Sequence, residues 1–116
     1  MTSTLVESME LEASVRLAAL AEPTRLRIVG LLGEGTCCVC DVRDAVDVAP
    51  NLLSYHLRVL REAGLVSATR RGRWIDYRLD PDGFEVLWAQ LAEAGIPLPG
   101  APAEVSTCTV RTEEGP

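Results

Sequence analysis

Three of the four cysteines in this 116-residue chain fall within four positions, at Cys37, Cys38 and Cys40. Thiolates are soft ligands that select thiophilic ions. Trivalent arsenic or antimony takes three sulfurs in a pyramid, whereas zinc takes four ligands in a tetrahedron, and cadmium and lead are further soft candidates. The three clustered thiols fit the first geometry, and adding Cys108 would fit the second. The cluster therefore predicts a soft-ion site, with these four cysteines as candidate ligands.

Other interpretations of the cysteines compete with an ion site. A free cysteine is often a small buried hydrophobe, but three of them in four residues favour a site. A Cys37–Cys38 disulfide is disfavoured, because adjacent Cα atoms lie about 3.8 Å apart, below the usual disulfide range. A redox switch that pairs Cys108 with the cluster stays open, as does Cys108 as an unused thiol.

The stretch that follows the thiols predicts a helix that could read DNA. Pro50 suits the first turn of a helix and Gly64 its end. A stripe with helical spacing is expected to be buried, and it consists of Leu53, Leu57 and Leu60. The polar side chains expected to face away from this stripe are Asn51, Ser54, Tyr55 and Arg58. A short helix over 39–45 and a turn at 47–49 precede the helix that begins at Pro50. These two helices have the helix-turn-helix pattern, in which the second helix enters the major groove.

Two short strand candidates come next, at 65–70 and 74–79, joined by Arg71-Gly72-Arg73 as a hairpin. With Arg70, the hairpin carries three arginines around one glycine. Such a tip is suited to contact phosphates or the minor groove beside a reading helix. A merely solvated turn is the alternative.

The remaining patterns predict helices around this core. Apolar spacing indicates one helix over about 5–20 and another that begins at Pro23. The second helix is apolar around most of its circumference, so we expect it to be central to the core. Asp80-Pro81 begins a last helix with one apolar face, consisting of Phe84, Leu87, Trp88 and Leu91. The fold class is mainly α with a small β-hairpin wing: a winged helix-turn-helix domain over 1–95. Residues 96–116 are expected to be a flexible Pro-rich tail that carries Cys108.

Charge is unevenly distributed along the chain. The net charge is −6, yet all 11 basic residues are arginines, and six of them lie between Asn51 and Leu79 against two acidic residues. A local basic surface can contact phosphates on an acidic protein, because salt screens charges beyond about 8–10 Å. No apolar run is long enough to span a membrane and the N-terminus does not resemble a secretory signal, so we expect a cytoplasmic protein. No convincing nucleophile–base set or phosphate loop appears, so we expect no enzyme activity.

Several segments together resemble the ArsR/SmtB winged-helix repressors. These are Leu20-Ala-Glu-Pro-Thr-Arg-Leu-Arg-Ile28, Cys38-Val-Cys-Asp41, Ser54-Tyr-His-Leu57, Leu60-Arg-Glu-Ala-Gly-Leu-Val66 and Arg71-Gly-Arg-Trp-Ile-Asp-Tyr-Arg-Leu79, within about residues 15–92. The resemblance implies a homodimer that pairs through its first and last helices and binds operator DNA. It also implies repression that is relieved by a metal or metalloid, and DNA contact by His56 in the reading helix.

The cysteine pattern resembles the arsenite-sensing branch most closely. That branch commonly has another cysteine three residues after Cys40, where this chain has Arg43, so Cys37 or Cys108 is the candidate third thiolate. The family's zinc sensors place Asp and His ligands on the last helix, and here that helix has no histidine.

Helix geometry suggests a mechanism for relief of repression. On an ideal helix Cys37 and Cys40 lie about 60° apart, whereas Cys38 and Cys40 point to nearly opposite sides. One ion could then collect all three thiols only by unwinding the first turn of the helix that supports the reading helix. A helix N-terminus also lowers thiol pKa values, which assists binding. We therefore expect As(III) or Sb(III) to act as inducer, with a Cd, Pb or Zn sensor or a metal-free thiol redox sensor as alternatives.

Overall fold

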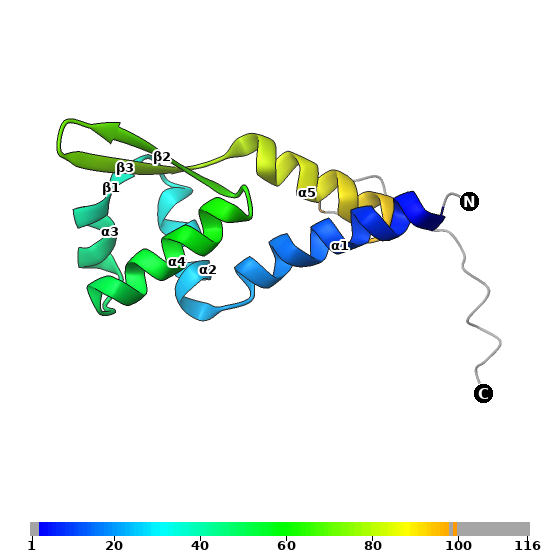
Figure 1. The fold of residues 1–116 in the computed structure, drawn as a ribbon, viewed down its shortest axis with the longest axis horizontal. Helices are drawn as coiled ribbons and strands as arrows, with labels where there is room; N and C mark the ends of the chain where they lie inside the picture. Colours follow the sequence, from blue (N-terminus) through cyan, green and yellow to red (C-terminus); the bar gives the residue numbers. More distant parts are fainter. Residues whose placement is uncertain (1–2, 98, 100–116) are drawn as a thin grey trace.

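The computed structural model describes residues 3–97 and residue 99. In that part of the chain the elements follow the order of a winged helix-turn-helix domain (Figure 1). They are α1 (Ser3–Leu20), α2 (Pro23–Leu32), β1 (Cys37–Cys38), α3 (Val39–Ala45), α4 (Pro50–Glu62), β2 (Val66–Arg71), β3 (Trp74–Leu79) and α5 (Pro81–Glu93). The predicted fold class, mainly α with a β wing, is therefore confirmed.

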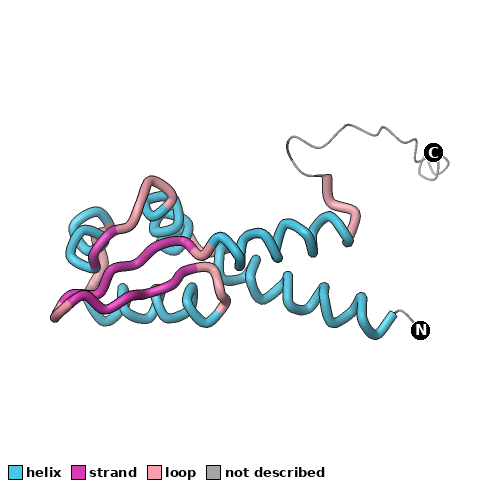
Figure 2. The backbone as a smooth tube through the Cα atoms, turned by 90° about the horizontal axis from the view of Figure 1, so that it is seen from above, coloured by secondary structure: helices cyan, strands magenta, loops and turns pink. Residues whose placement is uncertain are grey.

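The long helices α1 and α5 lie side by side and extend away from a body made of α2, α3, α4 and the sheet (Figures 1 and 2). A polar bridge joins them: Arg16 donates to the Gln90 side chain at 3.2 Å, and Gln90 donates to Glu12 at 2.9 Å. The carboxylate of Asp80 caps α5 by accepting from the backbone N–H groups of Asp82 and Gly83. The bridge therefore holds the two helices to each other, and the cap defines where α5 begins.

The core lies beneath α4. Leu53, Leu57 and Leu60 are each at most 2% exposed, as the helical spacing predicts. They pack with residues of α2, α3, the α4–β2 turn and β2, namely Ile28, Leu32, Val42, Val46, Leu65 and Val66. Pro50 occupies the first turn of α4, as expected. One face of α4 is therefore buried against the body, and its opposite face is exposed to solvent.

The sheet has one strand more than the two that the sequence predicts. The order is β1-β3-β2 with all pairings antiparallel, so β3 is the middle strand. Strand β1 consists only of Cys37 and Cys38, whose register partners in β3 are Tyr77 and Asp76. At the wing tip Arg71 pairs with Trp74, so the turn is the two residues Gly72-Arg73, and Gly72 adopts a φ of +64°. The thiol segment is thus joined directly to the wing.

Two predicted apolar surfaces are only partly buried. In α2 the buried residues are Ile28 and Leu32, whereas Leu26 is 54% exposed, so this helix is less central than predicted. In α5 Leu87 is buried, but Trp88 is 46% exposed and contacts Phe84 with ring centroids 5.8 Å apart. The predicted tail, including Cys108, lies outside the described residues apart from positions 96, 97 and 99.

Candidate thiol site and nucleic-acid interface

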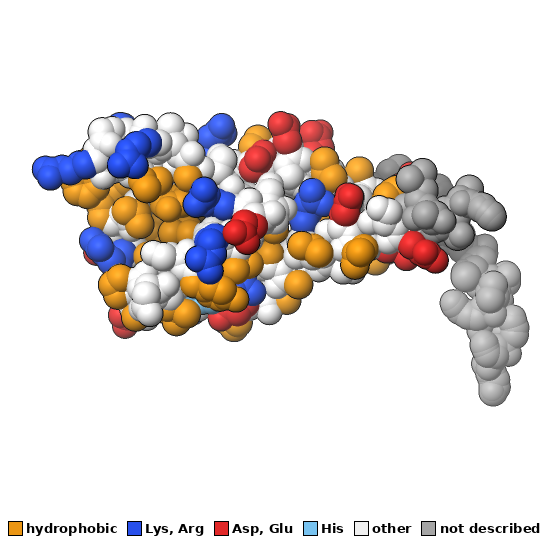
Figure 3. Space-filling view, in the orientation of Figure 1, with side chains coloured by type: hydrophobic (Ala, Val, Ile, Leu, Met, Phe, Trp, Pro, Cys, Tyr) orange, Lys and Arg blue, Asp and Glu red, His pale blue; other side chains and the backbone are white. Residues whose placement is uncertain are grey.

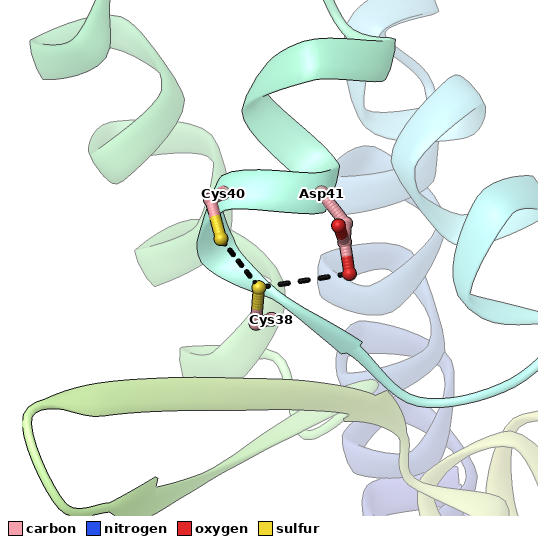
Figure 4. Close-up of side chains that lie close together, drawn as sticks. All are labelled: Cys38, Cys40 and Asp41. Carbon is pink, nitrogen blue, oxygen red and sulfur yellow. Dashed lines mark hydrogen bonds between the residues drawn. The ribbon is translucent and has the colours of Figure 1, made fainter.

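Cys38, Cys40 and Asp41 bring two sulfurs and a carboxylate together at the start of α3 (Figure 4). The Sγ atoms of Cys38 and Cys40 lie 2.6 Å apart, and the Cys38 thiol donates to Asp41 Oδ2 at 3.6 Å. All three ligand atoms lie within 4.8 Å of one another. The two thiols are half-buried and the carboxylate is exposed, so an ion can reach the group from solvent.

The backbone at Cys38 explains why the two sulfurs converge. Cys38 is not part of the helix: it is the last residue of β1 and the N-cap of α3, with φ −80° and ψ 163°. The ideal-helix argument, which placed Cys38 and Cys40 on nearly opposite sides, is therefore wrong. An ion can bind both thiols without unwinding the first turn of α3.

Cys37 is separated from the cluster, although its neighbour Cys38 belongs to it. Successive side chains of a strand point to opposite faces, and Cys37 packs against the hydrophobic core. Its Sγ donates to the carbonyl oxygen of Gly35 at 3.7 Å. Burial is the main cause that raises the pKa of Cys37, which keeps this thiol protonated. Among the described residues the third ligand atom beside the two sulfurs is a carboxylate oxygen of Asp41, which the sequence analysis did not single out.

The expected lowering of thiol pKa values by the helix N-terminus is also wrong for Cys40. The hydrogen bond with Cys38 is the main cause that raises the pKa of Cys40, and desolvation adds to it. Binding of a cation must therefore displace the proton from Cys40.

An ion pair in the wing lies next to this site. Arg71 donates from Nε to Asp76 Oδ2 at 2.7 Å and from Nη2 to Oδ1 at 3.0 Å. This bidentate contact is the main cause that lowers the pKa of Asp76. Because Asp76 is the register partner of Cys38, the thiol site and the wing arginine are connected through one residue of β3.

The predicted reading face is mostly exposed. On α4 the side chains of Asn51, Ser54, Tyr55 and Arg58 are exposed, and the guanidinium of Arg58 lies over the Tyr55 ring at 5.6 Å. On the wing, the exposed arginines are Arg70, Arg71 and Arg73. Basic side chains gather at the wing end of the molecule (Figure 3). The exposed Leu52, at 44%, adds an apolar residue to this face that the polar pattern did not indicate.

His56 does not belong to this face, contrary to the prediction. It is 5% exposed and points from α4 toward the α1–α2 junction, where Nη1 of Arg25 lies 3.0 Å from its Nδ1 atom. The carboxylate of Glu22 lies 4.0 Å from the same nitrogen. The imidazole is therefore directed into the body and is not part of the exposed face of α4.

Comparison with known proteins places the chain in a family. A family model described as "Bacterial regulatory protein, arsR family" matches residues 22–68. The "Arsenical resistance operon repressor" of Escherichia coli K12 is 49% identical over 63 residues, which are 53% of this chain and 54% of that protein. This chain thus spans about half the length of that relative. The "Transcriptional repressor SmtB homolog" of Synechocystis is 35% identical over 91 residues, 75% of this chain and 69% of that protein.

Solved structures agree with the sequence matches. A structure titled "Possible transcriptional regulator for arsenical resistance" is 41% identical, with a TM-score of 0.63 over 71% of this chain and 85% of that one. The chain belongs to the ArsR family of winged helix-turn-helix regulators. This is a family of transcriptional regulators and not of enzymes, in agreement with the sequence analysis. None of the helices in residues 3–97 is long and apolar enough to cross a membrane.

Proposed function

We propose that this protein is a repressor that binds operator DNA as a homodimer and is released when As(III) or Sb(III) binds Cys38 and Cys40. The observation that carries the proposal is the convergence of these two sulfurs at the start of the helix that supports α4. Two relatives named for arsenic resistance, in E. coli and in Pseudomonas putida, support the choice of ion.

The DNA contact follows from the exposed faces of α4 and the wing. Asn51, Ser54 and Tyr55 lie in the N-terminal half of α4, the half that contacts base edges in helix-turn-helix proteins. Arg58, Arg70 and Arg73 would contact phosphates. Arg71 differs from them because its guanidinium is already engaged by Asp76.

The ligand set is two thiolates and one further group. Trivalent arsenic favours three sulfurs, and the cluster supplies two. Since Cys37 packs against the core, we propose Cys108 as the third thiolate, although it lies outside the described residues.

A second candidate has support from Asp41. Its carboxylate belongs to the cluster, and an oxygen ligand suits zinc better than trivalent arsenic. A two-sulfur, one-oxygen site completed by water or by Cys108 would make the protein a sensor of Zn, Cd or Pb. The number of sulfurs bound to the ion separates the two candidates.

The sheet provides a route from the thiols to the DNA contacts. An ion that holds Cys38 against Cys40 acts on β1, whose partner β3 leads to the wing tip. It also acts on the first turn of α3, which precedes α4. The proposed release therefore combines displacement of the wing with displacement of the reading helix, and it needs no unwinding of α3. A tenfold to hundredfold fall in DNA affinity corresponds to a coupling free energy of about 1.4–2.8 kcal/mol.

The test is a DNA-release assay with As(III), Sb(III), Cd(II), Pb(II) and Zn(II), using a duplex that the wild-type protein selects from a randomised pool. We expect As(III) to release the wild type, and Cys38→Ser and Cys40→Ser to abolish release while DNA binding persists. Cys37→Ser is the matched control and should still respond. Cys108→Ser decides the third ligand. A protein that stays on DNA while X-ray absorption shows arsenic bound to its sulfurs would contradict the proposal.

A further inference from the structure

A buried contact joins the reading helix to the end of α1. Arg25, in the first turn of α2, is half-buried and extends toward both elements. Its Nε donates to the carbonyl oxygen of Ala19 at 2.6 Å, and Nη2 donates to that of Ala18 at 3.5 Å. Its remaining nitrogen, Nη1, lies 3.0 Å from His56 Nδ1 on α4. One guanidinium thus contacts two helices besides its own.

The chemistry of the two side chains fixes the direction of the contact. A guanidinium only donates hydrogen bonds, so Nδ1 of His56 must be the acceptor and the ring proton must lie on Nε2. The carbonyls of Ala18 and Ala19 belong to the last turn of α1, where a cation is favourable. The backbone N–H of Arg25 donates to the side chain of Glu22, the N-cap residue of α2. This hydrogen bond is the main cause that lowers the pKa of Glu22.

We propose that Arg25 and His56 are positioning residues for DNA binding, which hold α4 at a set angle to α1. This inference rests on the proposed DNA-binding function. Because α1 packs beside α5, the contact connects the reading helix to the two helices that extend from the body. Removal of the acceptor at position 56 would leave a buried N–H of Arg25 without a partner.

Small changes of angle matter because α4 is long. Its 13 residues span about 20 Å, so a tilt of 10° about one end moves the other end by about 3 Å, the length of a hydrogen bond. If the freed helix holds the binding-competent angle one-tenth of the time, the apparent DNA affinity falls about tenfold. The side chains on the exposed face would be unchanged, and only their placement would differ.

Substitutions at position 56 separate positioning from packing. In His56→Asn the amide oxygen takes nearly the place of Nδ1, whereas in His56→Gln it takes nearly the place of Nε2. Both variants are polar and smaller than or similar to histidine, so they are a matched pair. We expect H56N to lose less than about threefold in affinity for the selected duplex, and H56Q and Arg25→Lys to lose about tenfold or more.

A spectroscopic readout tests the contact independently of DNA. His56 is the only histidine of the chain, so long-range ¹H–¹⁵N NMR spectra contain a single imidazole. We expect an unprotonated, hydrogen-bonded Nδ1 and a protonated Nε2 at neutral pH, with the Nδ1 signal shifted in Arg25→Lys. A wild-type ring with its proton on Nδ1 would overturn the proposal.

Equal losses of affinity in H56N and H56Q, or losses that merely follow the melting temperatures, would also overturn it, because burial alone would then explain the residue. If the wild-type protein selects no duplex, the proposed function fails. The NMR result then still shows whether the Arg25–His56 contact exists.

Discussion

At Gly83, α5 passes close to the α4–β2 turn. A Cβ atom built at this position would lie 1.7 Å from the carbonyl oxygen of Gly64, which is backbone and cannot move aside alone. The absence of a side chain therefore allows α5 to leave the body in its observed direction.

We predict that Gly83→Ala lowers the free energy of unfolding by about 1–3 kcal/mol, because the helix must shift to admit the methyl group. Gly30→Ala is the control: it is also helical, no atom lies within 4 Å of the added Cβ, and it should stabilise by about 0.5–1 kcal/mol. Urea unfolding measures both. Equal effects of the two substitutions would show that the close approach does not constrain α5.

Asp76 gives a prediction about pH at the wing. The Arg71 guanidinium holds the pKa of this carboxyl below its usual value, because it favours the ionised form. The contact therefore adds stability above the unfolded-state pKa, and this stability is lost as the pH falls through the lowered value. We expect a ¹³C NMR titration to give Asp76 a pKa below that of an ordinary aspartate, and Arg71→Gln to restore it. An unshifted value in the wild type would show that the ion pair does not persist in solution.

At the scale of elements, α2, α4 and α5 each begin with proline in their first turn, but α4 and α5 are capped differently. Asp80 caps α5 with its side chain, whereas Ala49, at the N-cap of α4, has none to offer. The backbone of Ala49 is extended, as an N-cap requires, so a hydroxyl could be added there without rearrangement.

We predict that Ala49→Ser raises the free energy of unfolding by about 0.5–1 kcal/mol and that Asp80→Ala lowers it by about 0.5–2 kcal/mol, since one gains and the other loses a cap. Thermal unfolding of the two variants measures both changes. A destabilised Ala49→Ser would mean that the start of α4 is held in a way that excludes a capping hydroxyl.

Local sequence patterns were sufficient to predict the elements whose ends and buried faces are marked by their own residues. Pro50, the leucine stripe and Gly64 mark α4, and the strands of the hairpin have the expected positions within one residue. Strand β1 has no local signal, because two residues cannot show an alternating pattern and their conformation depends on pairing with β3. The error about Cys38 and Cys40 follows from this omission, since the angle between them was calculated for a helix.

His56 shows the same limit for a side chain. Its helical position lies between Leu53 and Leu60, on the buried side, but the resemblance of Ser54-Tyr-His-Leu57 to the family's reading helix favoured DNA contact. Its burial depends on Arg25, which is 31 residues away in sequence and supplies the hydrogen bond that a buried imidazole needs. Neither Arg25 nor Asp76 was singled out as a site residue, because their partners come from other elements.

At the scale of the whole molecule, α1 and α5 carry exposed apolar side chains. Leu11 and Val15 of α1 are 66% and 55% exposed, and Trp88 of α5 is 46% exposed. Large exposed apolar surfaces mark interaction sites, and these two helices are the ones through which the homodimer was expected to form.

We predict that the wild type is a dimer and that Trp88→Glu is monomeric, because a carboxylate at the proposed interface would be buried without a partner. Trp74→Glu on the wing is a matched control, since this tryptophan is 44% exposed but lies on neither helix. Sedimentation velocity at micromolar concentration distinguishes the two variants. A dimeric Trp88→Glu protein would place the interface elsewhere.

The described ligand atoms all come from positions 38 to 41, a single short stretch at the border of the sheet. None of these ligand atoms belongs to α4, and none belongs to the core beneath it. In the proposed sensor, this stretch together with Cys108 would act as a cassette: its exchange, in evolution or in the construction of a biosensor, would change the ion detected while the operator recognised stays the same.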